Sequence, residues 1–170
     1  MTHERDRIHD YVAAHPGEHF NGLVRALDLA PGQVQYHLTR LECQERVVEQ
    51  PIYGRTHYFT PEYDASERRA IGVLRRETAR GVLFYLLENG PCRPASVADG
   101  LDIARSTLEW HLDHLAEQGL VEKRRDSANH VTLVVSDPGW TVRVLEEITP
   151  SLSDRMLDRF TRLVDNLLSR

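Results

Sequence analysis

The sequence lacks most features of secreted, membrane-spanning and redox-active proteins. Its two cysteines, Cys43 and Cys92, lie far apart and belong to no Cys-x-x-Cys motif, so they predict neither a disulfide framework nor a cysteine-ligated metal site. No apolar run approaches the roughly 20 residues that span a bilayer. The N-terminal residues Met1–Asp6 also lack the apolar stretch of a signal peptide. We therefore expect a soluble, cytoplasmic protein.

Catalytic motifs are absent as well. The sequence contains no G-x-x-x-x-G-K, G-x-S-x-G, H-E-x-x-H or Rossmann glycine pattern. His111 and His114 lie three residues apart on one predicted helix and could share a metal ion, but no third or fourth ligand is apparent. We therefore expect no enzyme, no catalytic residues, no cofactor and no bound metal.

Lysine is almost missing, and the charge balance is acidic. Lys123 is the only lysine among 21 basic residues, and the net charge is −5. A net negative charge argues against a nonspecific coat for nucleic acid. It does not exclude a specific reader, because a local basic patch can lie on an acidic body. Arginine also matches phosphates and guanine edges better than lysine does.

The chain contains one pattern twice. When the sequence is shifted against itself by 74 positions, no gap is needed from Ile8 to Gln50. A repeat of this kind indicates two copies of one domain. Similar residues include the pair Tyr36 and Trp110. The identical pairs include Tyr11 and Tyr85, Leu27 and Leu101, Asp28 and Asp102, Ala30 and Ala104, His37 and His111, Leu38 and Leu112, Leu41 and Leu115, and Val47 and Val121.

Each copy predicts three helices followed by a β-hairpin. Apolar residues recur at intervals of three and four along each predicted helix, which gives one buried face. A tight turn at Asp28–Ala30 separates the second helix from the third, and two short helices joined in this way form a helix-turn-helix unit. β-Branched residues at 47–59 and 121–135 then predict the two hairpins.

These elements predict a mainly α protein with small β-wings, of the α+β class. We expect two winged helix-turn-helix domains in tandem plus C-terminal helices. The expected boundaries are 1–60 for the first domain, 61–75 for a helical linker, 76–137 for the second domain and 138–170 for a C-terminal helical region.

The C-terminal region ends in an apolar stripe that lies outside both repeats. Such a stripe either docks on its own domain or joins two copies of the chain. Small transcription factors usually read two half-sites as dimers, so we expect a homodimer through this helix. The stripe comprises Leu152, Met156, Phe160, Leu163, Val164, Leu167 and Leu168.

The third helix of each copy resembles a known family. Residues Val34–Glu42 resemble the recognition helix of ArsR/MarR-like winged-helix regulators, and Ser106–Glu122 is similar to their S-T-V-x-x-H-L-x-x-L-x-x-x-G-L-V pattern. The resemblance covers roughly residues 2–135. The tandem arrangement, the acidity and the scarce lysine resemble winged-helix proteins of halophilic archaea. Metal-sensing members carry a cysteine pair in this helix, where the present chain has only Cys43 near the end.

This resemblance, together with the entry of a third helix into the major groove, predicts the residues that contact double-stranded DNA. The stretch Leu29–Leu41 has no acidic residue, so we expect copy one to read bases. Copy two carries Glu109 and Asp113 on its third helix and is expected to read weakly, grip the backbone or serve as a scaffold. The predicted contacts are Gln33, Gln35, Tyr36, Arg40, Arg55 and His57 in copy one, and Arg105, Ser106, Thr107, Trp110, Arg124 and Arg125 in copy two.

The sequence therefore favours a sequence-specific DNA-binding transcriptional regulator that acts as a dimer at promoters and is associated with the nucleoid. The alternative is a winged-helix assembly module that holds another protein of the transcription machinery without sequence-specific DNA binding of its own. The acidic third helix of copy two favours that alternative. No residue pattern identifies a small-molecule effector.

Overall fold

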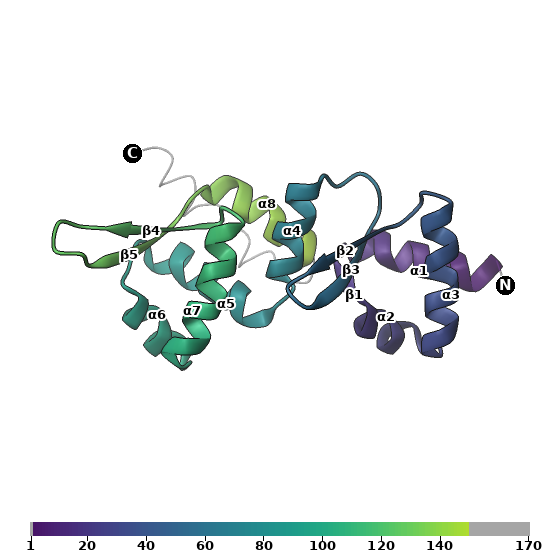
Figure 1. Ribbon diagram of the computed structural model, residues 1–170, viewed down its shortest axis with the longest axis horizontal. Helices are drawn as coiled ribbons and strands as arrows, with labels where there is room; N and C mark the ends of the chain where they lie inside the picture. The colour runs from purple at the N-terminus through teal and green to yellow at the C-terminus, as the bar shows by residue number, and fades with distance from the viewer. Residues whose placement is uncertain (1, 150–170) are drawn as a thin grey trace. The chain divides into compact units, whose positions relative to one another are not determined.

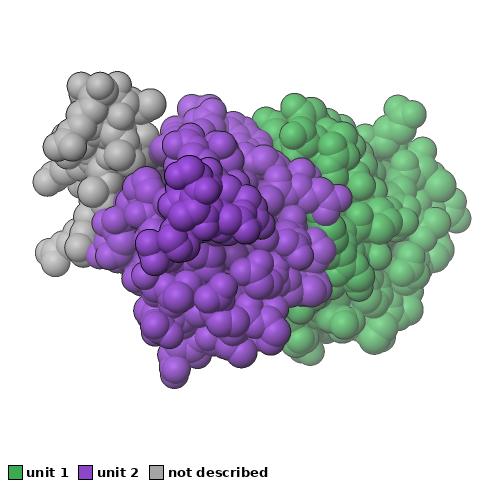
Figure 2. Space-filling view, turned by 60° about the vertical axis from the view of Figure 1, so that its left-hand side comes forward, with its two compact units in different colours: residues 1–75 green, residues 76–170 purple. Residues whose placement is uncertain are grey.

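The computed structural model describes residues 2–149 and divides the chain into two compact units. Unit 1 comprises Met1–Arg75 and unit 2 comprises Arg76–Arg170 (Figure 2). Both contain the predicted helices and antiparallel hairpin, so the α+β class and the tandem winged helix-turn-helix arrangement are confirmed. No helix within residues 2–149 is long and apolar enough to cross a membrane.

Unit 1 is built around the helix-turn-helix pair α2 and α3 (Figure 1). Side chains from three helices and the hairpin form its core, which includes Ile8, Leu23, Leu38 and Tyr58. Its elements are α1 (Thr2–Ala14), β1 (Glu18–His19), α2 (Phe20–Leu27), α3 (Pro31–Cys43), β2 (Val48–Ile52), β3 (Arg55–Phe59) and α4 (Ala65–Leu74).

The hairpin of unit 1 carries a third strand that the sequence did not predict. β2 and β3 pair in the register Val48 to Phe59, and β1 pairs with the other edge of β3 through Glu18 and Tyr58. Tyr53 and Gly54 both have positive φ, at 45° and 81°, as a two-residue hairpin turn requires. The two-residue β1 strand is too short to produce an alternating sequence pattern.

Helix α4 packs within unit 1. Its side chains Ala70, Ile71, Val73 and Leu74 are buried, and a Cβ at Gly72 would collide with the side chain of Ile52. The guanidinium of Arg75 also donates hydrogen bonds of 3.0 Å and 2.7 Å to the carbonyl oxygen of Pro16. Residues 61–75, expected as a linker, therefore lie inside the first unit, because α4 packs against β2 of that unit.

Unit 2 repeats this plan, including a helix after its hairpin. Asp28 and Asp102, at equivalent positions after α2 and α6, both adopt the left-handed conformation with φ of 52°. An isolated bridge between Cys92 and Leu133 stands where unit 1 has β1. The elements are α5 (Glu77–Asn89), α6 (Pro94–Leu101), α7 (Arg105–Glu117), β4 (Val121–Arg125), β5 (Val131–Val135) and α8 (Pro138–Ile148).

A carboxyl pair lies where the end of α3 meets β2. Burial raises the pKa of Glu42, and the neighbouring Glu49 raises it further through charge repulsion and a hydrogen bond. Burial, together with these two carboxylates, raises the pKa of Tyr58 to about 12. Ionisation of Glu42 therefore opposes folding of unit 1.

The burial of the α3 side chains leads to a prediction about the stability of unit 1. Leu38 is fully buried, so Leu38→Ala should lower the free energy of unfolding by about 2–5 kcal/mol. The exposed Arg25 provides the control, since Arg25→Ala should stay within about 0.5 kcal/mol of the parent chain. Urea denaturation followed by circular dichroism measures both, and equal losses would contradict the packing described here.

The carboxyl pair predicts a pH dependence. When a carboxyl group has a higher pKa in the folded state than in the unfolded state, the folded protein loses stability as the pH rises above the pKa of the unfolded state. Glu42→Gln should therefore raise the melting temperature relative to the parent at pH 7 and have a smaller effect at pH 4. Glu62→Gln, at an exposed position, should show no such difference between the two pH values.

Candidate nucleic-acid interface

The outer face of α3 carries every residue predicted to contact DNA from that helix. Its inner face is buried through Val34, His37, Leu38 and Leu41, and this spacing turns the intervening positions outward. The exposed predicted residues are Gln33, Gln35, Tyr36 and Arg40.

Contacts within α3 hold these side chains in place. The backbone N–H of Ala30 donates to Gln33 Oε1 at 3.2 Å, so Gln33 caps the start of the helix. Gln35 Nε2 lies 3.5 Å from Thr39 Oγ1. The guanidinium carbon of Arg40 lies 5.5 Å from the centre of the Tyr36 ring, which is 43% exposed. Tyr36 and Arg40 thus form a cation–π pair at the surface.

The wing of unit 1 supports one of its two predicted contacts. Arg55 is exposed at the start of β3, but His57 is fully buried and its Nδ1 lies 2.7 Å from the carbonyl oxygen of Gly17. The prediction that His57 contacts DNA is therefore wrong. The last three residues of β3, His57 to Phe59, are all buried, so the period-two alternation of a strand does not single out His57 as a core residue.

The exposed face of α7 in unit 2 differs from that of α3 in its aromatic contacts and in its charged contacts. Arg105, Ser106 and Thr107 are exposed in its first turn. Trp110 is 43% exposed, as Tyr36 is, and the Arg76 guanidinium lies 4.9 Å from its ring centre. The rings of His111 and His114 contact Trp110 edge-on at 4.8 Å and 4.2 Å.

Protonation of His111 is opposed at this aromatic cluster. Burial lowers the pKa of His111, and the charges of Arg76 and His114 lower it further. A neutral imidazole at position 111 adds no positive charge toward a phosphate.

Three charged side chains are joined across α7 and β4. Lys123 Nζ lies 3.1 Å from Glu109 Oε2 and 2.9 Å from Asp113 Oδ1. Burial alone would lower the pKa of Lys123, but the hydrogen bonds to Asp113 and Glu109 outweigh it and the pKa is raised. Lys123 therefore neutralises part of the acidic face of α7.

The wing of unit 2 exposes both of its predicted arginines. Arg124 pairs with Glu122 at 3.2 Å, and the Arg125 side chain donates to Asn129 Oδ1 at 3.1 Å. The turn between β4 and β5 is held by Asp126, whose Oδ1 accepts hydrogen bonds from the backbone N–H groups of Ala128 and His130. The hydrogen bond from His130 is the main reason that the pKa of Asp126 lies below its usual value.

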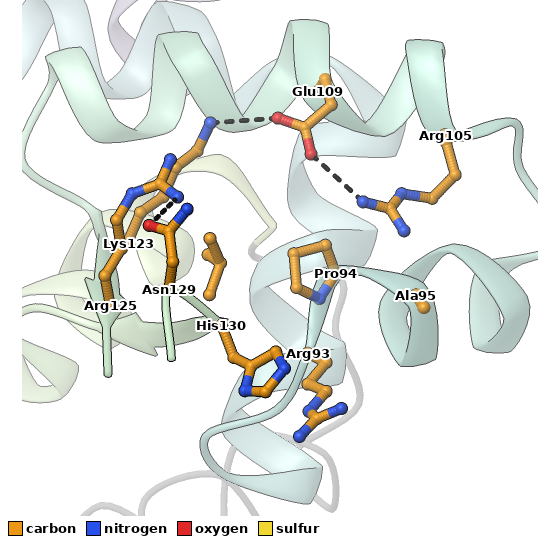
Figure 3. Close-up of a pocket in the computed structure, with 10 residues that line it drawn as sticks. Arg93, Pro94, Ala95, Arg105, Glu109, Lys123, Arg125, Asn129 and His130 are labelled. Atoms are coloured by element: carbon orange, nitrogen blue, oxygen red, sulfur yellow. Dashed lines mark hydrogen bonds and ion pairs between the residues drawn. The ribbon is translucent and has the colours of Figure 1, made fainter. Parts of the chain in front are cut away.

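A pocket of about 340 Å³ lies between this wing, α7 and the start of α6 (Figure 3). It includes Arg93, Lys123 and His130, which the sequence did not predict as site residues. Arg93 comes directly before α6, and only the fold shows that it lies beside the wing. The lining comprises Arg93, Pro94, Ala95, Arg105, Glu109, Lys123, Arg125, Asn129, His130 and Val131.

The ion-paired lysine gives a direct test of this geometry. Because Lys123 is the only lysine in the chain, its ¹³Cε NMR signal needs no assignment. Replacing Glu109 by Gln and Asp113 by Asn together should lower the pKa of Lys123, since burial then acts without the two negative charges that favour the ammonium form. Identical titration curves for the parent and the double variant would show that the three charges are not joined.

Two different family models match the chain, one over most of unit 1 and one over part of unit 2. Residues 2–71 match a family model described as an N-terminal HTH domain, and residues 74–124 match one described as a helix-turn-helix domain. No curated protein matches the chain.

Solved structures of AbfR share 20% sequence identity with this chain at a TM-score of 0.41. The disulfide-formed AbfR structure aligns over 79% of this chain and 84% of its own. The structure of reduced AbfR bound to DNA aligns over 81% and 89%. A likeness this distant carries no argument, so the assignment depends on the two family models and the repeated geometry. The chain consists of two winged helix-turn-helix domains in tandem, each matched by its own helix-turn-helix family model.

Proposed function

We propose that this chain is a sequence-specific DNA-binding transcriptional regulator, associated with the nucleoid, in which α3 of unit 1 reads bases. The observation that carries the proposal is the contrast between the two third helices. The predicted contacts on α3 are exposed and include no carboxylate, whereas α7 carries Glu109 and Asp113 beside its own. Carboxylates near phosphates weaken binding to DNA, and their absence favours α3 as the reader.

The side chains of α3 suit base edges in the major groove. The amide of Gln35 can pair with adenine, and the guanidinium of Arg40 can pair with guanine or a phosphate. The Tyr36 ring offers an apolar surface to a thymine methyl group and lies against Arg40. Gln33 uses its Oε1 to cap α3, which leaves its amide nitrogen as the donor. Arg55 would contact the backbone from the wing.

In this proposal unit 2 contacts the DNA backbone more than it reads the base sequence. Arg105 is paired with Glu109 at 3.6 Å, and Glu109 and Asp113 are both joined to Lys123. The exposed Arg124 and Arg125 of the wing suit phosphate contacts, which hold a protein on DNA without reading its sequence. In this proposal Ser106, Thr107 and Trp110 lie at the DNA surface as well.

We also propose that the regulator acts as a homodimer at promoters. The apolar stripe from Leu152 to Leu168, which motivates this proposal, lies outside the described residues. A dimer would bring two copies of α3 to two half-sites, as small helix-turn-helix regulators require. Sedimentation of the full chain should give a dimer that Leu163→Glu converts to a monomer, and a monomeric parent chain would contradict the proposal.

The reader assignment predicts an asymmetry between the two copies. A DNA site selected from a randomised duplex library should bind the Gln35→Ala, Tyr36→Ala, Arg40→Ala variant at least about 100-fold more weakly, because three contacts are lost and each good base contact contributes about 1–3 kcal/mol. The matched control changes the equivalent positions of α7, Glu109, Trp110 and His114, to alanine and should retain the sequence preference of the parent.

The same experiment distinguishes the alternative function. A chain that selects no sequence from the library would favour the assembly module, whose protein-binding face would include the exposed Trp110 and the carboxylates of α7. A preference that survives in the α3 variant but disappears in the α7 control would place the reader in unit 2 and overturn the assignment.

A further inference from the structure

The pocket of unit 2 gathers positive charge on an acidic protein. The lining contains four cationic side chains, Arg93, Arg105, Lys123 and Arg125, and one carboxylate, Glu109, while the whole chain has a net charge of −5. Figure 3 shows these side chains around one space, with Glu109 between Lys123 and Arg105. Asp113 and Asp126 are not among the lining residues but pair with Lys123 and His130, so the excess of positive charge comes from the three arginines. The pocket therefore suits an anion.

Several of these donors are held in place by neighbouring groups. Glu109 lies 3.6 Å from Arg105 and 3.1 Å from Lys123, so one carboxylate fixes two cations. Asn129 accepts a hydrogen bond from Arg125 at 3.1 Å, and Asp126 lies 3.2 Å from Nδ1 of His130. Donors that are already positioned lose less conformational freedom when an anion binds.

The start of α6 adds to this arrangement. Pro94 and Ala95, the first two residues of α6, line the pocket, and Arg93 precedes them. Pro94 has no N–H, and the N–H groups of Ser96 and Val97 donate to the carbonyl oxygen of Arg93 at 3.0 Å and 3.3 Å. The contribution of α6 is therefore the partial positive charge at its N-terminus and not a set of free N–H donors. Helix N-termini are therefore favourable places for phosphate oxygens when side-chain cations surround them.

The first unit shows that this charge is not a requirement of the fold. Under the 74-residue shift, Arg93 corresponds to His19, Arg105 to Pro31 and Lys123 to Glu49. None of these counterparts is permanently positive, although both units form the same helix-turn-helix and hairpin. The cations belong to the second copy alone, so a ligand of that copy accounts for them better than packing does.

We infer that the pocket between α6, α7 and the β4–β5 wing binds a phosphate group. Guanidinium groups pair with phosphate oxygens in a two-pronged geometry, and three arginines are present here. Two sources present this chemistry, a backbone phosphate of DNA and a free phosphorylated compound. Binding of a DNA backbone phosphate rests on the proposed function, whereas binding of a free phosphorylated compound does not.

The test titrates the full-length chain with inorganic phosphate and with pyrophosphate in the absence of DNA. Isothermal calorimetry measures affinity, and the single Lys123 signal reports on the pocket. Replacing Arg93 and Arg125 together by Gln should weaken binding at least tenfold, with Arg105→Gln as a second variant. Arg143→Gln removes an exposed charge of unit 2 outside the pocket lining and should bind as the parent does.

A second measurement separates the two sources. If the pocket takes a DNA phosphate, saturating pyrophosphate should weaken DNA binding. Removing Arg93 and Arg125 should also reduce the slope of log K against log salt by about 0.9, since the pocket holds one phosphate and each lost phosphate contact contributes about 0.9. If pyrophosphate binds through these arginines while DNA affinity is unchanged or increased, the pocket takes a free phosphorylated compound.

The inference is overturned if the parent and the pocket variants bind phosphate equally or not at all and show the same salt slope with DNA. That result would leave base reading by α3 intact. Conversely, loss of the α3 assignment would not affect phosphate binding measured without DNA, so the two proposals fail separately.

Discussion

The outward face of each third helix depends on the burial of its inner stripe. Val34, Leu38 and Leu41 in α3 are fully buried, and so are Leu108, Leu112 and Leu115 in α7. Because side chains three and four residues apart share one face of a helix, this packing fixes which positions face solvent. The left-handed Asp28 and Asp102, with the same φ of 52°, then set the start of each third helix relative to the helix before it.

The same scaffold carries two different surfaces. In unit 1 the exposed positions of α3 hold amide, aromatic and guanidinium groups without a carboxylate. In unit 2 the equivalent surface contains Glu109 and Asp113, both paired with Lys123, beside a pocket rich in arginine. Exposed ion pairs contribute little to stability. We therefore attribute to these pairs a role in positioning charged side chains on the surface of unit 2. The repeat thus separates base reading from phosphate binding in our proposal.

Periodicity predicted the helices, both hairpins and the exposed face of α3, because these features depend on local spacing. The burial of His57 was not predicted, because the last three residues of β3 are all buried and period-two alternation does not produce that pattern. The packing of α4 in unit 1 depends on contacts between residues far apart in the sequence, such as Arg75 with Pro16. The presence of Arg93 and Arg125 in one pocket also depends on the tertiary fold. Local spacing in the sequence predicts neither. The DNA contacts and the homodimer stay predictions.

Genome-wide occupancy of the tagged chain tests the central claim most directly. We expect sharp peaks at promoters that share one sequence motif, and their loss when Gln35, Tyr36 and Arg40 are all changed to alanine. Peaks that persist unchanged in this variant would contradict base reading by α3, and the absence of peaks for the parent chain would contradict sequence-specific regulation itself.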